Sequence, residues 1–318
     1  MELFVYKGEF CLPSVDFDCI RVLTYLKLAE ITNVTVNYTG NPFKSDNGFL
    51  PYLVDENKKY CGYERIISRI QKKKGYQLIS SAKEISYLSE NLYPYFMYQL
   101  WGNPQNQDET RKIYANRTPF PFNFYSPGKL IRRTDELVQT VANFSLEDPT
   151  EMHDTSEMSF RAKKCLNWIS EKLGKNDYFL ENCKSEVDAT LFSFLSIILK
   201  YQLVNTNCQL QAHAKQCENL VRYVNNMTKK YFKESELFES PTAKAQNQKQ
   251  EQKVFTGNEE EEPKGTVRRR YFLSGLFATT AMVSYAFLAG IFSIPRSGDR
   301  DDSGSFNFSE VITGDDDE

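Results

Sequence analysis

The fold of this chain is decided by KSEVDATLFSFLSIILKY, residues 184–201. Residues 189–199 within it carry no charge and are mostly apolar, which suits either a membrane span or a helix buried in a soluble domain. A helix of that length extends about 16 Å, whereas the hydrocarbon core of a bilayer is about 30 Å thick. We therefore predict a soluble helix that is buried on nearly all sides.

The start of this helix carries a capping signal. Ser185 can accept a hydrogen bond from a backbone N–H that the first helical turn leaves unpaired, and Asp188 stands three residues later, where its carboxylate can reach back to the cap. An acid in the first turn also interacts favourably with the positive end of the helix dipole. Ser185 and Asp188 thus predict a structural N-terminal capping box.

The composition indicates a packed protein without a nucleic-acid or metal site. Hydrophobic residues make up 41% and aromatic residues 14% of 318, which is enough for a substantial core. The net charge of −3 gives no basic footprint for nucleic acid. None of the seven cysteines lies in a CxxC pair or at ligand spacing beside His153 or His213, so we expect neither a disulfide framework nor a zinc site.

A second apolar segment is long enough to cross a membrane. It starts at Tyr271, ends at Ile294 and holds 24 residues without a charge. As a helix it is about 36 Å long, which spans a bilayer with some tilt. The alternative is a buried core helix, although such helices seldom lack charge over this length. We predict a transmembrane anchor here.

The charges beside this anchor predict its orientation. Arg268, Arg269 and Arg270 directly precede it and are expected to hold that side in the cytosol. Residues 295–318 carry two arginines and eight acids, a net charge of −6. We predict a tail-anchored protein whose first 270 residues or so face the cytosol, followed by the span and an acidic tail.

Residues 1–78 are expected to form a first domain. The predicted elements are strands at residues 3–6, 33–38, 49–54 and 58–63, a hairpin turn at Glu56 and Asn57, a helix after Pro13 and a helix that buries Ile66, Ile67 and Ile70. This β-α-β-β-β-α order is the thioredoxin-like pattern. Pro51 conflicts with a buried strand unless Leu50–Pro51 is a cis peptide in a turn before it; a trans proline that opens an edge strand is the alternative.

Residues 79–239 have helical periodicity and are expected to form an all-helical second domain. Two apolar stripes stand out, one of Ala162, Leu166, Ile169 and Leu173, the other of Cys217, Leu220, Val221, Val224 and Tyr231. Residues 240–270 are polar and have almost nothing to bury. They predict a flexible tether between the domains and the span.

Together these features resemble the glutathione S-transferase superfamily. The shared features are a thioredoxin-like N-terminal domain with a cis-proline, an all-helical second domain and a Ser-x-x-Asp box that opens a buried central helix. We therefore expect an α+β, glutathione S-transferase-like fold to which a C-terminal transmembrane helix has been added.

The resemblance narrows to the metaxin family, in its metaxin 1 and 3 branch. The stretches that carry it are GEFCLPSVDFDCIRVLTYLKL at 8–28, TPFPFNFYSPGKLIRR at 118–133 and RRRYFLSGLFATTAMVSYAFLAGI at 268–291. The similarity covers most of the chain but is poor at 147–157 and in the tether. It implies a protein of the mitochondrial outer membrane that takes part in protein import and β-barrel assembly.

The same resemblance implies the partners. They are a second, metaxin 2-like protein, the sorting and assembly machinery of the outer membrane and mitochondrial precursor proteins, and family members are also linked to cristae-organising complexes and motor adaptors. It implies no cofactor. The function expected from it is that of a non-catalytic subunit that acts by protein–protein binding.

The alternative function is a tail-anchored glutathione transferase. Such an enzyme needs a hydroxyl or thiol that stabilises the glutathione thiolate, for which Tyr6, Cys11 and Ser14 are the candidates. For Ser14 the competing role is to cap the helix that follows it. For Tyr6 it is packing on the strand, and for Cys11 it is that of a free loop thiol.

Two more positions belong to a glutathione site in this fold. The backbone of Leu50 beside Pro51 would pair with the tripeptide, and Glu64 would hold its γ-glutamyl end. Arg65 departs from the pattern, because a small hydroxyl is expected there. Ser14, Leu50, Pro51 and Glu64 are thus vestigial candidates, and we predict no catalytic residue.

The run PFPFNF at residues 119–124, followed by Tyr125, is a further candidate for function. Exposed aromatic side chains often anchor interfaces. Alternating proline and phenylalanine also pack well between helices. The sequence leaves a binding surface and a piece of core equally open for this segment.

Overall fold

The structure is a computed structural model that describes residues 1–39, 41–75, 77–142, 146, 154–181, 183–202 and 209–239. These residues belong to one compact unit, Met1–Gln252, and the second unit is Lys253–Glu318. The predicted tether, the predicted span from Tyr271 to Ile294 with its three arginines, and the acidic tail lie outside the described residues. Within the described ranges, no helix is long and apolar enough to cross a membrane.

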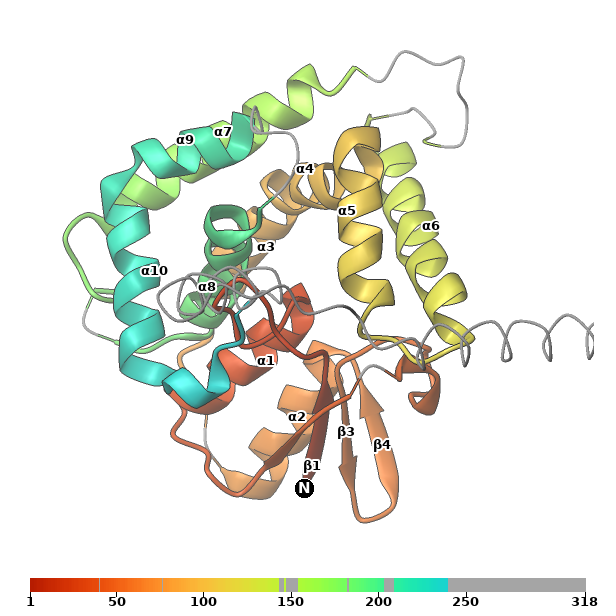
Figure 1. The fold of residues 1–318 in the computed structure, drawn as a ribbon. Coiled ribbons are helices and arrows are strands. Elements are labelled where there is room, and N and C mark those ends of the chain that lie inside the picture. The colour runs from red at the N-terminus through yellow and green to blue at the C-terminus, as the bar shows by residue number, and fades with distance from the viewer. Residues whose placement is uncertain are drawn as a thin grey trace, which may run out of the picture. The chain divides into compact units, whose positions relative to one another are not determined.

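A four-stranded mixed sheet forms the N-terminal part of the fold (Figure 1). Its strands are β1 (Glu2–Val5), β2 (Thr35–Tyr38), β3 (Tyr52–Asp55) and β4 (Lys58–Cys61), in the spatial order β2-β1-β3-β4. Leu3 pairs with Val36 of parallel β2 and with Leu53 of antiparallel β3. The hairpin between β3 and β4 turns at Glu56 and Asn57, both with positive φ, as the sequence predicts.

Two helices accompany this sheet, α1 (Phe17–Leu28) and α2 (Tyr63–Lys74). They pack against each other, since the rings of Tyr25 and Tyr63 meet edge to face at 6.5 Å and Gln71 donates to the Tyr25 hydroxyl at 3.1 Å. The order β-α-β-β-β-α is therefore confirmed. The third strand begins at Tyr52 rather than at residue 49, because the turn with the cis Leu50–Pro51 peptide comes first.

Helices make up the rest of the described chain. They are α3 (Ala82–Asn91), α4 (Tyr93–Met97), a π-helical turn (Tyr98–Gly102), α5 (Pro104–Ala115), α6 (Phe122–Ala142), α7 (Ser156–Leu173), α8 (Glu186–Lys200), α9 (Gln209–Gln216) and α10 (Glu218–Tyr231). Short 3-10 turns occur at Pro42–Lys44 and Glu234–Glu236. The mixed sheet and the helical remainder give the glutathione S-transferase-like fold that the sequence predicts.

The helix predicted from residues 184–201 is α8, which lies in the middle of the helices in Figure 1. Every side chain from residue 186 to 198 is buried. Its serines and threonine need no outside partner for their hydroxyls; Ser193, for example, donates to the Ala189 carbonyl one turn earlier at 2.7 Å. The prediction that this stretch forms a helix buried on nearly all sides is confirmed.

The two predicted apolar stripes fare differently. Ala162, Leu166, Ile169 and Leu173 are completely buried in α7. In α10 the second stripe is wrong in part, since Cys217, Val221 and Tyr231 are only half-buried. The helix starts at Glu218, and its buried face continues from Leu220 and Val224 to two residues that the prediction missed, Tyr223 and Met227. Both are the expected three or four residues from a stripe position.

After α10 the chain returns to the N-terminal part. Residues 232–239, which we call the strap, pair with the loop between β1 and α1: the Cys11 N–H donates to the Phe238 carbonyl at 2.9 Å, and the Phe238 N–H donates to the Leu12 carbonyl at 3.3 Å. Gly8 makes room for this arrangement, because a Cβ there would lie 1.9 Å from the Leu12 oxygen. No local pattern of residues 232–239 predicts the strap.

Candidate functional site

The loop between β1 and α1 is where a glutathione transferase would present its thiolate-stabilising group. In this chain Ser14 is fully buried in the loop, and its Oγ accepts a hydrogen bond from the Asp16 N–H at 3.3 Å. The helix is capped by Asp16, whose Oδ1 accepts from the Cys19 N–H at 3.0 Å. The capping role predicted for Ser14 is therefore wrong. Asp16 has the extended backbone of an N-cap and stands directly before Phe17, two residues after Ser14.

Side chains of the helical part hold this loop from behind. The Val15 carbonyl accepts hydrogen bonds from the hydroxyls of Tyr114 in α5, at 3.2 Å, and of Tyr201 just after α8, at 2.5 Å. Tyr114 also lies 3.3 Å from Asp16 Oδ2. The space beside Val15 is thus occupied by the protein's own phenol groups.

Tyr6, the second candidate, is packed away as well. It is 3% exposed, and its ring meets Tyr114 edge to face at 5.2 Å. Burial, and then the nearby charge of Asp16, raise the pKa of Tyr6 well above its ordinary value. The Cys19 thiol of α1 is also completely buried, and burial raises its pKa in the same way. Both groups stay protonated and out of reach of a dissolved thiol.

Cys11 is the candidate that solvent reaches. It has a positive φ of 56° and pairs through its N–H with the strap. Its carbonyl accepts a hydrogen bond from Lys200 Nζ at 3.1 Å, at the end of α8. Burial lowers the pKa of Lys200. Among Tyr6, Cys11 and Ser14, only this thiol could meet an external molecule.

The proline turn lies where the sequence predicts. Leu50–Pro51 is a cis peptide, and both residues are buried directly ahead of β3. The Pro51 carbonyl accepts a hydrogen bond at 3.1 Å from Gly62, which caps α2 with a φ of +83°. The turn and the start of α2, which carries Glu64, are therefore joined as a glutathione site would require.

The acid at the start of α2 is engaged by a cation that the sequence analysis missed. Glu64 is exposed, and its Oε1 lies 3.7 Å from Nη2 of Arg21, a buried residue of α1. The Arg21 guanidinium lies 3.5 Å from the centre of the Tyr63 ring, and its Nη2 is 3.8 Å from Glu186 Oε1 in α8. Arg65, the residue that departs from the glutathione-site pattern, is exposed. An arginine in an apolar-looking helix pattern gave no local signal of such a role.

The acids at the start of α1 have raised pKa values. Burial, followed by the neighbouring Asp18, raises the pKa of Asp16 to about 6. Burial also raises the pKa of Asp18, while Arg21 and Arg133 lower it. These carboxyls are half-buried; Asp16 lies beside Tyr114 of α5, and Asp18 interacts with Arg21 of α1 and Arg133 of α6.

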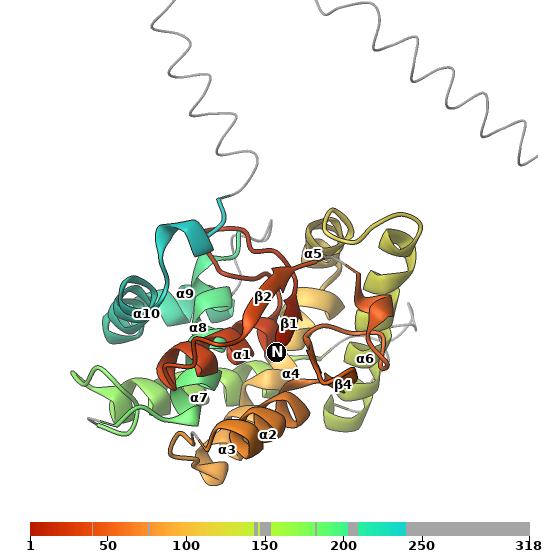
Figure 2. The ribbon, with the colours of Figure 1, turned by 90° about the horizontal axis from the view of Figure 1, so that it is seen from below.

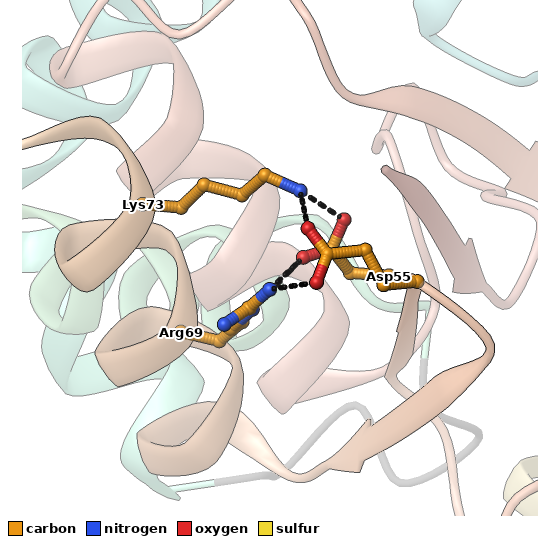
Figure 3. Close-up of polar contacts among 4 residues, drawn as sticks. Asp55, Arg69 and Lys73 are labelled. Atoms are coloured by element: carbon orange, nitrogen blue, oxygen red, sulfur yellow. Dashed lines mark hydrogen bonds and ion pairs between the residues drawn. The ribbon is translucent and has the colours of Figure 1, made fainter.

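A second polar cluster ties α2 to the β3–β4 hairpin. Figure 3 shows Arg69 and Lys73 reaching from α2 to the buried Asp55, at 2.6 Å each from Arg69 Nη2 to Oδ2 and from Lys73 Nζ to Oδ1. Glu56 completes it, 2.8 Å from Lys73. Two acids and two cations balance one another here. The arrangement is that of a structural ion-pair network, and the described residues contain no cluster of His, Cys, Asp or Glu that could hold a metal ion.

The capping box is confirmed in full. The Asp188 N–H donates to Ser185 Oγ at 3.3 Å, and Asp188 Oδ2 accepts from the Ser185 N–H at 3.0 Å and from its hydroxyl at 2.6 Å. Asp188 Oδ1 accepts two more bonds, from the Phe179 N–H at 2.8 Å and the Tyr223 hydroxyl at 3.1 Å. One carboxylate thus joins α8, α10 and the loop before α8.

The aromatic run at 119–124 is a surface, which decides between the two readings of the sequence. Phe120, Phe124 and Tyr125 have exposed fractions of 70%, 67% and 53%. Phe122 alone turns inward, with its ring stacked on Phe43 at 4.1 Å.

The chain is similar to two protein families and to named relatives. A family described as "Outer mitochondrial membrane transport complex protein" matches residues 19–131, and "Glutathione S-transferase, C-terminal domain" matches residues 162–227, which include the capping box. A metaxin-1 homolog of Drosophila melanogaster is 41% identical over 73% of this chain and 72% of its own length.

The chain is also similar to two further relatives and to a solved structure. Metaxin-1 of Macaca fascicularis is 33% identical over 93% of this chain and 92% of its own, and metaxin-3 of Xenopus laevis is 32% identical over 73% and 77%. A glutathione S-transferase of Ceriporiopsis subvermispora, solved in complex with glutathione, is 12% identical over 73% of this chain and 97% of its own, with a TM-score of 0.47.

Proposed function

This chain belongs to the metaxin family, and from that premise we propose that it is a non-catalytic subunit of the machinery that imports proteins and sorts and assembles β-barrels at the mitochondrial outer membrane. The match of residues 19–131 to an outer mitochondrial membrane transport complex protein supports the place of action. We further propose a C-terminal anchor, a body that faces the cytosol, and binding to a second metaxin, to the assembly machinery and to precursor proteins.

The packing of the loop between β1 and α1 is the observation that supports a binding role over catalysis, because its candidate hydroxyls are buried. Ser14 is 0% exposed and Tyr6 is 3% exposed. Tyr114 and Tyr201 donate to the backbone between Ser14 and Asp16, so opening the loop would break two buried hydrogen bonds. A transferase must bring the glutathione thiol against a stabilising hydroxyl, and the buried hydroxyls of Ser14 and Tyr6 cannot be approached in this way.

The observations that favour a transferase are fewer. The cis Leu50–Pro51 peptide, the acid Glu64 and an exposed thiol at Cys11 remain in the positions that a glutathione site would use. Glu64, however, already has the Arg21 guanidinium beside it. These features belong to the glutathione S-transferase-like fold, and for this reason the test includes variants of Cys11 and Ser14.

The function is tested by assembly of a labelled β-barrel precursor in mitochondria that lack the chain. We expect poor assembly without it and full recovery with the unchanged chain. The variant Cys11→Ser/Ser14→Ala should restore assembly equally well, because the proposal gives neither group a chemical role. Failure of that variant at equal abundance, or unimpaired assembly without the chain, would refute the proposal.

Two further measurements complete the test. Purified chain should pass through immobilised glutathione, and it should show no conjugating activity, beside a glutathione transferase as positive control. Retention that free glutathione reverses and that Cys11→Ser or Ser14→Ala abolishes would favour the glutathione transferase instead. A fluorescent fusion to residues 264–318 should mark mitochondria, and protease added outside intact mitochondria should digest the body.

A further inference from the structure

The start of α6 carries an aromatic patch, which we define as Phe120, Phe124 and Tyr125. Six large hydrophobic side chains are exposed in the described part of the chain, and three of them lie within residues 120–125. The rings of Phe120 and Phe124 meet edge to face at 6.2 Å. An exposed apolar cluster of this kind marks a contact surface rather than a random scatter.

The patch is presented by a firm support. Phe122, between the exposed rings, stacks on Phe43 of the β2–β3 connection at 4.1 Å, and Tyr125 lies 5.8 Å from the same ring. Ser126 and Pro127, which follow directly, are buried. The outward direction of the patch is therefore set by packing on its inner side.

The segment that carries the patch is basic. Residues 117–133 contain Arg117, Lys129, Arg132 and Arg133 and no acid. Lys129 Nζ lies 5.2 Å from the centre of the Tyr125 ring, and Arg132 and Arg133 are exposed on the following turn of α6. Arg117 is paired with Glu9 at 2.6 Å, and Arg133 interacts with Asp18, which leaves Lys129 and Arg132 as the cations beside the aromatic rings. Aromatic rings beside cations are the side chains found at the surface of an anionic bilayer.

The described chain ends close to this patch. Glu239, its last residue, lines a cavity of about 710 Å³ together with Asn116 and Arg117 at the end of α5. Phe120 follows Arg117 by three residues. Figure 2 shows the strap after α10 and the connection between α5 and α6 on the same side of the body, at the top of the view. The described chain therefore ends on the same side of the body as the connection that carries the aromatic patch.

We propose that the aromatic patch, with Lys129 and Arg132, contacts the surface of a bilayer that contains anionic lipid. Phe120 and Phe124 would enter the boundary between headgroups and acyl chains, and the cations would meet lipid phosphates. The inference rests on the proposed anchor only in that the anchor keeps a bilayer within reach. It would fix the orientation of the body and leave the other faces to partner proteins.

The test uses the full-length chain in phosphatidylcholine vesicles with and without phosphatidylserine, with lipids brominated near the headgroup as quenchers. Phe124→Trp reports on the patch. Phe160→Trp in α7 is the matched control, because Phe160 is 66% exposed, much as Phe124 is at 67%. The unchanged chain supplies the background from Trp101 and Trp168.

We expect quenching of the tryptophan at position 124 in vesicles with phosphatidylserine, and little at position 160. Arg132→Gln in the Phe124→Trp chain should lower the ratio of docked to undocked protein about five-fold, the effect of one cation at an anionic surface. Equal quenching at both positions would overturn the proposal. The proposal would also be overturned if the tryptophan at position 124 were not quenched and if, in mitochondria, a crosslinker at position 124 joined the chain to protein rather than to lipid.

The anchor is measured separately by carbonate extraction of the same vesicles. Resistance to carbonate without quenching at position 124 would overturn the patch and leave the anchor standing. Release by carbonate with quenching retained would contradict the anchor and support the patch.

Discussion

Arg21 of α1 donates a hydrogen bond from Nε to Thr190 Oγ1 of α8 at 2.8 Å, across 169 positions of sequence. The same guanidinium covers the Tyr63 ring at the start of α2, and the Tyr63 hydroxyl donates to Glu186 Oε1 at 2.9 Å. One buried cation thus connects the sheet-bearing part with the central helix. Arg21 also lies beside Glu64, the acid that would bind glutathione in a transferase. Its contacts with Tyr63, Glu186 and Thr190 give it a structural role in this chain.

Replacing Arg21 should weaken this connection strongly. Arg21→Met removes the partner of the buried Glu186 carboxylate, and we expect a loss of about 3 kcal/mol in the free energy of unfolding, measured with urea in mild detergent. Adding Glu186→Gln should recover part of that loss, because the stranded charge is then gone. Glu186→Gln alone is measured as well. A double variant that loses the sum of the two single losses would show that the two side chains are not coupled.

The capping box should matter more than an ordinary helix cap. Asp188→Ala leaves three donors without their acceptor, namely the N–H and hydroxyl of Ser185 and the Phe179 N–H, and it leaves the Tyr223 hydroxyl with only the backbone carbonyl of residue 188, at 3.3 Å. We expect a loss of about 4 kcal/mol in the free energy of unfolding. Glu157→Ala, an exposed acid in the first turn of α7, is the control and should cost less than about 0.5 kcal/mol. Similar effects of the two changes would contradict the role given to Asp188.

Features decided by neighbours in sequence could be predicted. The spacing of Ser185 and Asp188 gave the capping box, because both partners lie in one helical turn. Pro51 gave the cis peptide, because a trans proline conflicts with a strand between two others. The thioredoxin-like order followed from alternation and turn residues in the same way.

Features decided by distant contacts could not be predicted. Nothing local marks Arg21 as the partner of Thr190, or Phe238 as the partner of Leu12. Ser14 and Asp16 are both acceptable caps by residue type, and the path of the loop under Tyr114 and Tyr201 chooses between them. Phe120 and Phe122 are the same residue type, each next to a proline. Only the position of Phe43, which is distant in sequence, decides that the Phe122 ring packs inward.

The network around Asp55 predicts a pH dependence of stability. Lys73, with Arg69, lowers the pKa of Asp55 through hydrogen bonds to its carboxylate. A carboxylate with a lowered folded-state pKa stabilises the fold above its unfolded value of about 3.9, and this stabilisation disappears as the pH falls through the folded value. Asp55→Asn should therefore cost about 2 kcal/mol at pH 7. The difference from the unchanged chain should shrink below about pH 4; a difference independent of pH would contradict the ion pairing.

Asp16 predicts the opposite dependence. Its folded-state pKa of about 6 lies above the ordinary value of 3.8, so the folded protein binds more protons than the unfolded chain between these values. Stability from this group is then greatest at low pH and falls as the pH rises from about 4 to about 6, by at most about 3 kcal/mol. Asp16→Asn keeps an oxygen that can accept from the Cys19 N–H and removes the titration. Urea unfolding across this range should show a flatter profile for the variant, and equal slopes would place the protonation elsewhere.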